Sequence, residues 1–171
     1  MLRKLLVVAA FLMLPAVAAN AQFQASDWEL TLSGQGANGP DFNGTNFGVS
    51  FGLGYFVSKE LEVAVRQSVN YSDDTGAGSS FAGITDLAID YHFDMGRWQP
   101  FLGANVGYRW GDVHNTFLAG PEGGVKYFVN ANTFIEFSVQ YEFFFDNNSD
   151  ASDAFSDGQF IYNLGIGFKW R

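Results

Sequence analysis

The last twelve residues of the chain, FIYNLGIGFKWR at positions 160–171, carry a large apolar side chain at every second position. These side chains are Phe160, Tyr162, Leu164, Ile166, Phe168 and Trp170. Between them lie mostly glycine, asparagine and lysine. Because successive side chains of a strand point to opposite sides, this period of two predicts a β-strand with two chemically different faces.

The same alternation recurs along the chain and predicts eight strands in all. They cover residues 28–32, 47–55, 61–71, 81–93, 100–110, 117–127, 135–145 and 160–170. Such segments have about the length, 9–11 residues, with which a tilted strand crosses a bilayer. The sixth has the weakest pattern, because Gly120 and Pro121 interrupt it.

The connections between these segments alternate in length. The longer ones, rich in Gly, Asn, Asp and Ser, are residues 33–46, 72–80, 111–116 and 146–158, and the short ones are 57–60, 94–97 and 129–132. An even number of strands, with long loops at one end and short turns at the other, is typical of a bacterial outer-membrane barrel.

The first 21 residues have a different character. Arg3 and Lys4 precede the apolar run LLVVAAFLMLPAVAA, which ends in the Ala19-Asn20-Ala21 pattern. A charged start, a short apolar run and small residues in this spacing predict a secretory signal peptide cut after Ala21. Residues 22–171 then form one domain.

Composition bears on both the function and the stability of the chain. The chain has a formal net charge of −9, which disfavours binding to nucleic acid. It contains no cysteine, so no disulfide can stabilise it. Aromatic residues make up 18% of the chain, and there are 20 glycines. The side chains on the apolar face of the strands are therefore unusually large, while those on the other face are small.

Alternation alone does not decide which face meets water, since a soluble lipocalin-like barrel would place the apolar face inside. The polar face carries small residues that suit the crowded interior of a narrow barrel: Gly48, Gly52, Gly54, Gly103, Gly107, Gly165 and Gly167. The apolar face carries aromatic residues at two levels, as in the interfacial girdles of membrane barrels. One level has Trp28, Tyr55, Tyr91, Phe93, Tyr127 and Trp170, and the other has Tyr71, Phe81, Trp110, Phe117 and Phe145. The sequence therefore predicts an all-β, eight-stranded antiparallel up-and-down transmembrane β-barrel.

Three stretches carry a resemblance to a known family: PFLGANVGYRWG (100–111), GPEGGVKYFV (120–129) and the C-terminal strand. The chain resembles the small eight-stranded outer-membrane barrels of the OmpA and OmpX type over residues 22–171. The resemblance implies a non-enzymatic protein of the bacterial outer membrane with both termini on the periplasmic side. It also implies contact with outer-membrane lipid and lipopolysaccharide, insertion by the barrel-assembly machinery, and a monomer. Barrels of this family usually end on an aromatic residue, whereas here Arg171 follows Trp170.

Charged residues on the polar face predict a structural ion-pair network that fills the lumen. Its expected members are Glu62, Arg66, Asp86, Asp90, Arg109, Glu122, Lys126, Glu136, Glu142 and Lys169, with Glu29 and His92 also on this face. Hairpin symmetry makes the expectation specific, since residues equally far from the centre of a turn lie opposite each other. Three pairs follow: Arg66 with Asp86, Glu62 with Asp90, and Lys126 with Glu136.

Other functions stay open as alternatives. The first is a narrow pore or carrier for small solutes, although eight strands leave little space beside the side chains. The second is an outer-leaflet lipid-modifying enzyme that would use His114 near Asp112. Residues 146–157 resemble an EF-hand loop in spacing, but Ala151 and Asp157 depart from its pattern, which favours a solvated acidic loop. We expect no catalytic residue, no cofactor and no metal.

Overall fold

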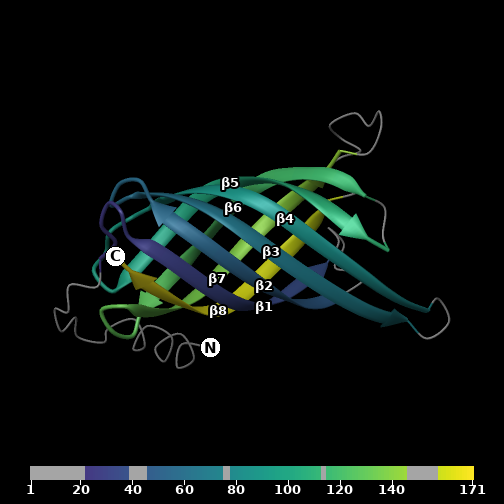
Figure 1. Ribbon diagram of the computed structural model, residues 1–171, viewed down its shortest axis with the longest axis horizontal. Helices are drawn as coiled ribbons and strands as arrows, with labels where there is room; N and C mark the ends of the chain where they lie inside the picture. Colours follow the sequence, from purple (N-terminus) through teal and green to yellow (C-terminus); the bar gives the residue numbers. More distant parts are fainter. Residues whose placement is uncertain (1–21, 39–45, 75–77, 113–114, 146–157) are drawn as a thin grey trace, which may run out of the picture.

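The computed structural model describes residues 22–38, 46–74, 78–112, 115–145 and 158–171. Within these residues, eight antiparallel strands pair in chain order and the last pairs with the first. They are β1 (Trp28–Asn38), β2 (Asn46–Phe56), β3 (Leu61–Asp74), β4 (Gly78–His92), β5 (Trp98–Gly111), β6 (Thr116–Phe128), β7 (Thr133–Phe144) and β8 (Gln159–Trp170). The closed barrel, seen from the side in Figure 1, confirms the predicted fold class.

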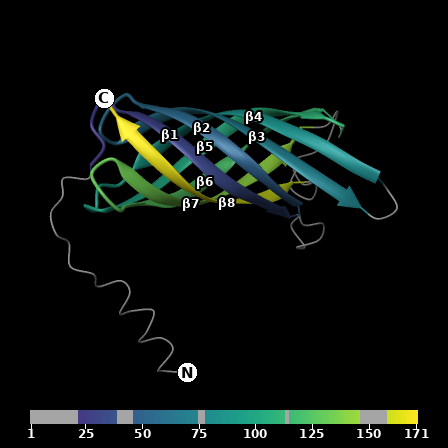
Figure 2. The ribbon, with the colours of Figure 1, turned by 60° about the horizontal axis from the view of Figure 1, so that its bottom comes forward.

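The barrel closes at a seam between β1 and β8, where Trp28 lies opposite Trp170. Closure leaves none of the eight described strands as an edge, so their backbone N–H and C=O groups pair within the protein. The seam places the start of β1 beside the C-terminus. We call this end, which also carries the β2–β3 and β6–β7 turns, the terminal end, and the opposite end the loop end. The terminal end is on the left in Figure 1, and Figure 2 shows β3 and β4 projecting at the loop end.

The ladders at the loop end are longer than the sequence predicts. The sequence pattern predicts a loop over residues 72–80, but the β3–β4 ladder continues to the pair Asp74 and Gly78. Likewise, β1 continues to Asn38, well into the expected loop 33–46. The alternation of apolar residues ends where a strand leaves the apolar environment. Backbone pairing needs no apolar side chain, so the ladders continue beyond that point.

Strand β6 is continuous despite Gly120 and Pro121. On the β5 side, Pro121 pairs with Ala104. On the β7 side, the ladder has pairs at Ala119 and Glu122 but none in between. Proline has no backbone N–H to donate, so this local gap is the expected consequence of its presence in a strand.

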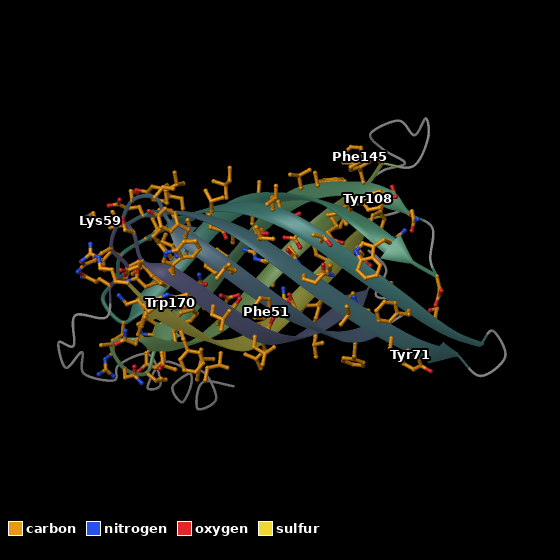
Figure 3. All side chains as sticks on the ribbon, viewed as in Figure 1. Phe51, Lys59, Tyr71, Tyr108, Phe145 and Trp170 are labelled. Atoms are coloured by element: carbon orange, nitrogen blue, oxygen red, sulfur yellow. The ribbon has the colours of Figure 1, made fainter. Side chains whose placement is uncertain are left out.

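The outer wall of the barrel is apolar. Its large exposed side chains include Leu32, Phe47, Val49, Leu87, Ile89, Leu102, Val106 and Leu164. In Figure 3, Tyr71, Tyr108 and Phe145 lie toward the loop end, Trp170 lies at the terminal end, and Phe51 lies between the two levels. Among the described residues, no helix is long and apolar enough to span a membrane.

Candidate functional site

The candidate site is the barrel interior, where hairpin register decides which charges lie opposite each other. The ladders pair Arg66 with Asp86, Glu62 with Asp90, and Lys126 with Glu136. All three predicted registers are confirmed. The shortest charge contacts, however, are different ones, because inward side chains in a narrow barrel reach across the lumen as well as along the wall.

Arg66 is the centre of one group of charges, which we call the Arg66 cluster: Arg66, Asp86, Asp90 and Glu122. The Arg66 Nη2 atom lies 2.8 Å from Asp90 Oδ2 and 2.7 Å from Glu122 Oε1. Asp86, the partner that hairpin symmetry predicts, is the most distant of the three, at 4.0 Å. Asn105 Nδ2 donates a hydrogen bond of 2.7 Å to Glu122 Oε2 and so helps to hold this carboxylate in place.

Lys126 is the centre of a second group, the Lys126 cluster, which consists of Lys126, Glu29, Glu62 and Glu136. Its ammonium group lies 2.6 Å from Glu29 Oε1 and 2.9 Å from Glu62 Oε2. The predicted partner, Glu136, is further away, at 3.8 Å. His92 Nε2 lies 2.8 Å from Glu62 Oε2. The like-charge opposition of Glu62 and Asp90 is therefore relieved by a different base at each carboxylate.

Glycines make room for these acidic side chains. A Cβ atom at Gly54 would overlap Glu62 Oε1, and one at Gly103 would overlap Asp90 Oδ1. These glycines lie on the strand that neighbours the one carrying the carboxylate. The glycine-rich polar face is therefore the wall against which the lumen carboxylates pack.

The other predicted network residues lie outside these two clusters. Arg109 stacks over the ring of Phe144 at 4.0 Å, and Glu142 accepts a hydrogen bond of 2.8 Å from Gln159 Nε2. The sequence places Lys169 in the lumen network, but its ammonium group pairs with Asp27 at 3.0 Å at the terminal end. The reason is its position near the end of β8, where an inward-facing side chain reaches the barrel mouth.

Two apolar layers cap the charged lumen, and the alternation pattern of the sequence did not predict them. The terminal-end layer consists of Phe23, Phe56, Phe128 and Phe134. The loop-end layer consists of Ala37, Ile84, Leu118, Phe144 and Ile161. A signal was present in adjacent apolar pairs such as Tyr55-Phe56 and Phe143-Phe144, because such a pair must place one side chain outside and the other inside.

The lumen carries more acid than base. On the described strands, seven inward carboxylates (Glu29, Glu62, Asp86, Asp90, Glu122, Glu136 and Glu142) face four cationic side chains (Arg66, Arg109, Lys126 and, at the barrel mouth, Lys169). Within the described part of the chain, no group of three or more His, Cys, Asp or Glu residues is arranged to hold a metal ion. His92 is 1% exposed and lies inside the barrel, out of reach of a membrane lipid. His114 and the acidic loop 146–157 lie outside the described residues.

A closed eight-stranded barrel with a charged lumen and an apolar outer wall defines the class of small outer-membrane barrels. No protein-family model matches the chain, and no curated protein matches its sequence. Solved structures do match. The outer membrane protein OprG of Pseudomonas aeruginosa is 14% identical, with a TM-score of 0.64, and the match covers 90% of this chain and 100% of that one.

Two further structures are similar. The N-terminal β-barrel domain of Pseudomonas aeruginosa OprF is 19% identical, with a TM-score of 0.61, and the match covers 85% of this chain and 98% of that one. Neisserial surface protein A is 16% identical, with a TM-score of 0.59, and the match covers 84% of this chain and 94% of that one. At these identities the likeness shows the fold, which is that of the small eight-stranded outer-membrane barrels.

Proposed function

We propose that this protein is a non-enzymatic outer-membrane barrel with a structural or cell-surface interaction role. The observation that carries the proposal is the filled interior: the Arg66 and Lys126 clusters lie between two apolar layers, while large apolar side chains are exposed on the outer wall. A closed barrel whose exposed outer wall is apolar is suited to a lipid environment. A lumen filled by side chains leaves little space for a solute to pass, so it favours a structural or interaction role over a channel.

We also propose that the terminal end faces the periplasm and the loop end faces the cell exterior. The short turns lie at the terminal end, and β3 and β4 extend at the loop end, as in outer-membrane barrels with short periplasmic turns and longer external loops. In this orientation the outer wall contacts outer-membrane lipid and lipopolysaccharide. The barrel-assembly machinery would insert the chain, which acts as a monomer after removal of residues 1–21.

The membrane part of the proposal is tested by refolding residues 22–171 with and without detergent. We expect a β-rich species only in detergent or lipid, which migrates differently on a gel before and after boiling. The physical reason is that the apolar wall is too large to be buried inside so small a barrel. A soluble monomer in plain buffer would contradict the proposal.

The choice between a platform and a pore is tested by recording current across a planar bilayer that contains the refolded protein. We expect no steady unitary conductance, because two apolar layers and two ion clusters occupy the lumen. Discrete, reproducible channel openings would instead support the narrow-pore alternative.

Mass spectrometry of lipid A from cells that overproduce the protein tests the enzyme alternative, and we expect no change in lipid mass.

A further inference from the structure

The terminal end of the barrel is closed by residues 22–27, which precede β1 and which we call the plug segment. Phe23 of this segment is inside the barrel mouth and is 3% exposed. Its ring stacks on that of Phe56, with centroids 3.9 Å apart and planes 10° apart. The edges of Phe128 and Phe134 complete an aromatic cup around it, with centroids at 5.1 and 5.9 Å.

The Phe23 ring covers the Lys126 cluster. The Lys126 ammonium group lies 5.3 Å from the centroid of Phe23 and 5.4 Å from that of Phe134, within the range of a cation–π interaction. Phe23 also contacts His92, with ring centroids 5.4 Å apart. Phe23 is therefore the member of the terminal-end layer that the plug segment supplies, and it packs against the buried Lys126 cluster and His92.

The last residues of the chain hold the plug segment in place. Lys169 Nζ donates a hydrogen bond of 2.6 Å to the Gln22 carbonyl oxygen and pairs with Asp27 at 3.0 Å. Arg171 donates to Gln24 Oε1 and to a backbone carbonyl of the same segment, both at 3.1 Å. Lys169 and Arg171 thus form a latch. The latch also gives a role to the charged residue that follows Trp170.

The barrel does not need the plug segment in order to close. The β1–β8 ladder begins at Trp28, after the segment ends. Two backbone hydrogen bonds join the base of the segment to Phe56. Ser26 N donates to the Phe56 carbonyl oxygen at 2.7 Å, and Phe56 N donates to the Asp27 carbonyl oxygen at 2.9 Å. Ser26 has a φ of 73°, the left-handed conformation that turns the chain back into the mouth. Residues 22–25 can therefore leave the mouth while every ladder bond stays intact.

We propose that the plug segment is a reversible cover of the terminal end, held by the Lys169–Arg171 latch. Withdrawal of Phe23 opens a one-sided vestibule whose walls are the aromatic cup and whose floor is the Lys126 cluster. The loop-end layer of Ala37, Ile84, Leu118, Phe144 and Ile161 stays in place, so the barrel does not become a through-pore. The hydrogen bonds that join the latch to Gln22, Gln24 and Ala25 are exposed, and segments held by exposed hydrogen bonds are among the parts of a fold that open first.

The test uses the absence of cysteine from the chain. The substitution His92→Cys places a thiol beneath Phe23, and a cationic methanethiosulfonate reagent reports its accessibility in detergent-refolded protein. In this background we compare three further changes: Phe23→Ala, the latch variant Lys169→Gln with Arg171→Gln, and Phe168→Ala. Phe168 is the matched control, because it lies near the same end on β8 but faces outward and is 46% exposed.

We expect the labelling rate to rise at least tenfold with Phe23→Ala, to rise less in the latch variant, which keeps the ring, and to stay unchanged with Phe168→Ala. Gel mobility before and after boiling verifies that each variant is folded. An unchanged rate in Phe23→Ala, or in the latch variant, would overturn the proposal. So would a steady through-current in Phe23→Ala, since the vestibule has only one opening. The labelling arm runs in detergent and is therefore independent of the proposed location and orientation.

Discussion

Arg66 on β3 and Glu122 on β6 are 56 residues apart in the chain, yet Arg66 Nη2 and Glu122 Oε1 lie 2.7 Å apart across the lumen. Lys126 on the same strand as Glu122 reaches Glu29 on β1 at 2.6 Å. The two contacts connect β3 to β6 and β6 to β1, pairs of strands that share no backbone ladder. The charged lumen is therefore a set of cross-links between distant parts of the barrel wall.

The first prediction concerns which carboxylate Arg66 depends on. Double-mutant cycles with Arg66→Ala should give a coupling energy of about 2 kcal/mol with Glu122→Ala and less than about 1 kcal/mol with Asp86→Ala. The contact with Glu122 is short and bidentate, whereas that with Asp86 spans 4.0 Å. The measurement is equilibrium unfolding in urea of protein refolded into lipid vesicles. A larger coupling energy with Asp86 would show that the partner opposite Arg66 in the hairpin contributes more to stability than the partner across the lumen.

The second prediction concerns Lys126. The substitution Lys126→Met should lower the free energy of unfolding by about 3–5 kcal/mol, because it leaves buried carboxylates without their base. Adding Glu29→Gln and Glu62→Gln should recover much of that loss, since these two carboxylates lie closest to the ammonium group. The same unfolding experiment measures both variants. Failure of the two glutamines to restore stability would mean that Lys126 acts mainly through its contacts with the aromatic rings.

A third prediction separates two kinds of glycine. Gly103→Ala should destabilise the barrel by about 1–3 kcal/mol, because its Cβ would overlap Asp90 and the Ile89 carbonyl oxygen. Gly34→Ala is the matched control on the outer wall, where the nearest atom to a new Cβ is the Leu164 carbonyl oxygen at 3.9 Å. We expect no loss of stability there. Equal losses at both positions would point to backbone conformation as the cause and exclude lumen packing.

The fourth prediction concerns assembly. Deleting Trp170 and Arg171 together should reduce the amount of folded barrel in the membrane more than deleting Arg171 alone. Trp170 forms the last pair of the closing seam, with Trp28, whereas Arg171 lies beyond the ladder. Trp170 also adds an aromatic side chain of the kind that favours the membrane interface. Membrane fractions from expressing cells, run on gels with and without boiling, give the yield. Similar yields from the two truncations would contradict this reasoning.

The candidate site could be predicted only in part. The hairpin registers of Arg66 with Asp86 and of Lys126 with Glu136 follow from sequence position, because residues equally far from the centre of a hairpin connection lie opposite each other. The closest partners, Glu122 for Arg66 and Glu29 for Lys126, do not follow. They belong to strands that are not neighbours in the sheet, and nothing in a single strand's pattern specifies which residues face each other through the lumen.

The strand count and the two faces of each strand can be read from the sequence, because a period of two is a local property of the backbone. The class of barrel follows from the residue types on each face, namely small residues on the polar face and aromatic residues at two levels on the apolar face. The sequence also determined that glycine and charge would face inward together. Three features are visible only in the folded barrel: Phe23 enters the barrel mouth, Lys169 and Arg171 hold it there, and inward apolar residues from distant strands meet in two layers. These arrangements depend on closing the sheet, since only closure brings side chains from opposite walls within contact distance.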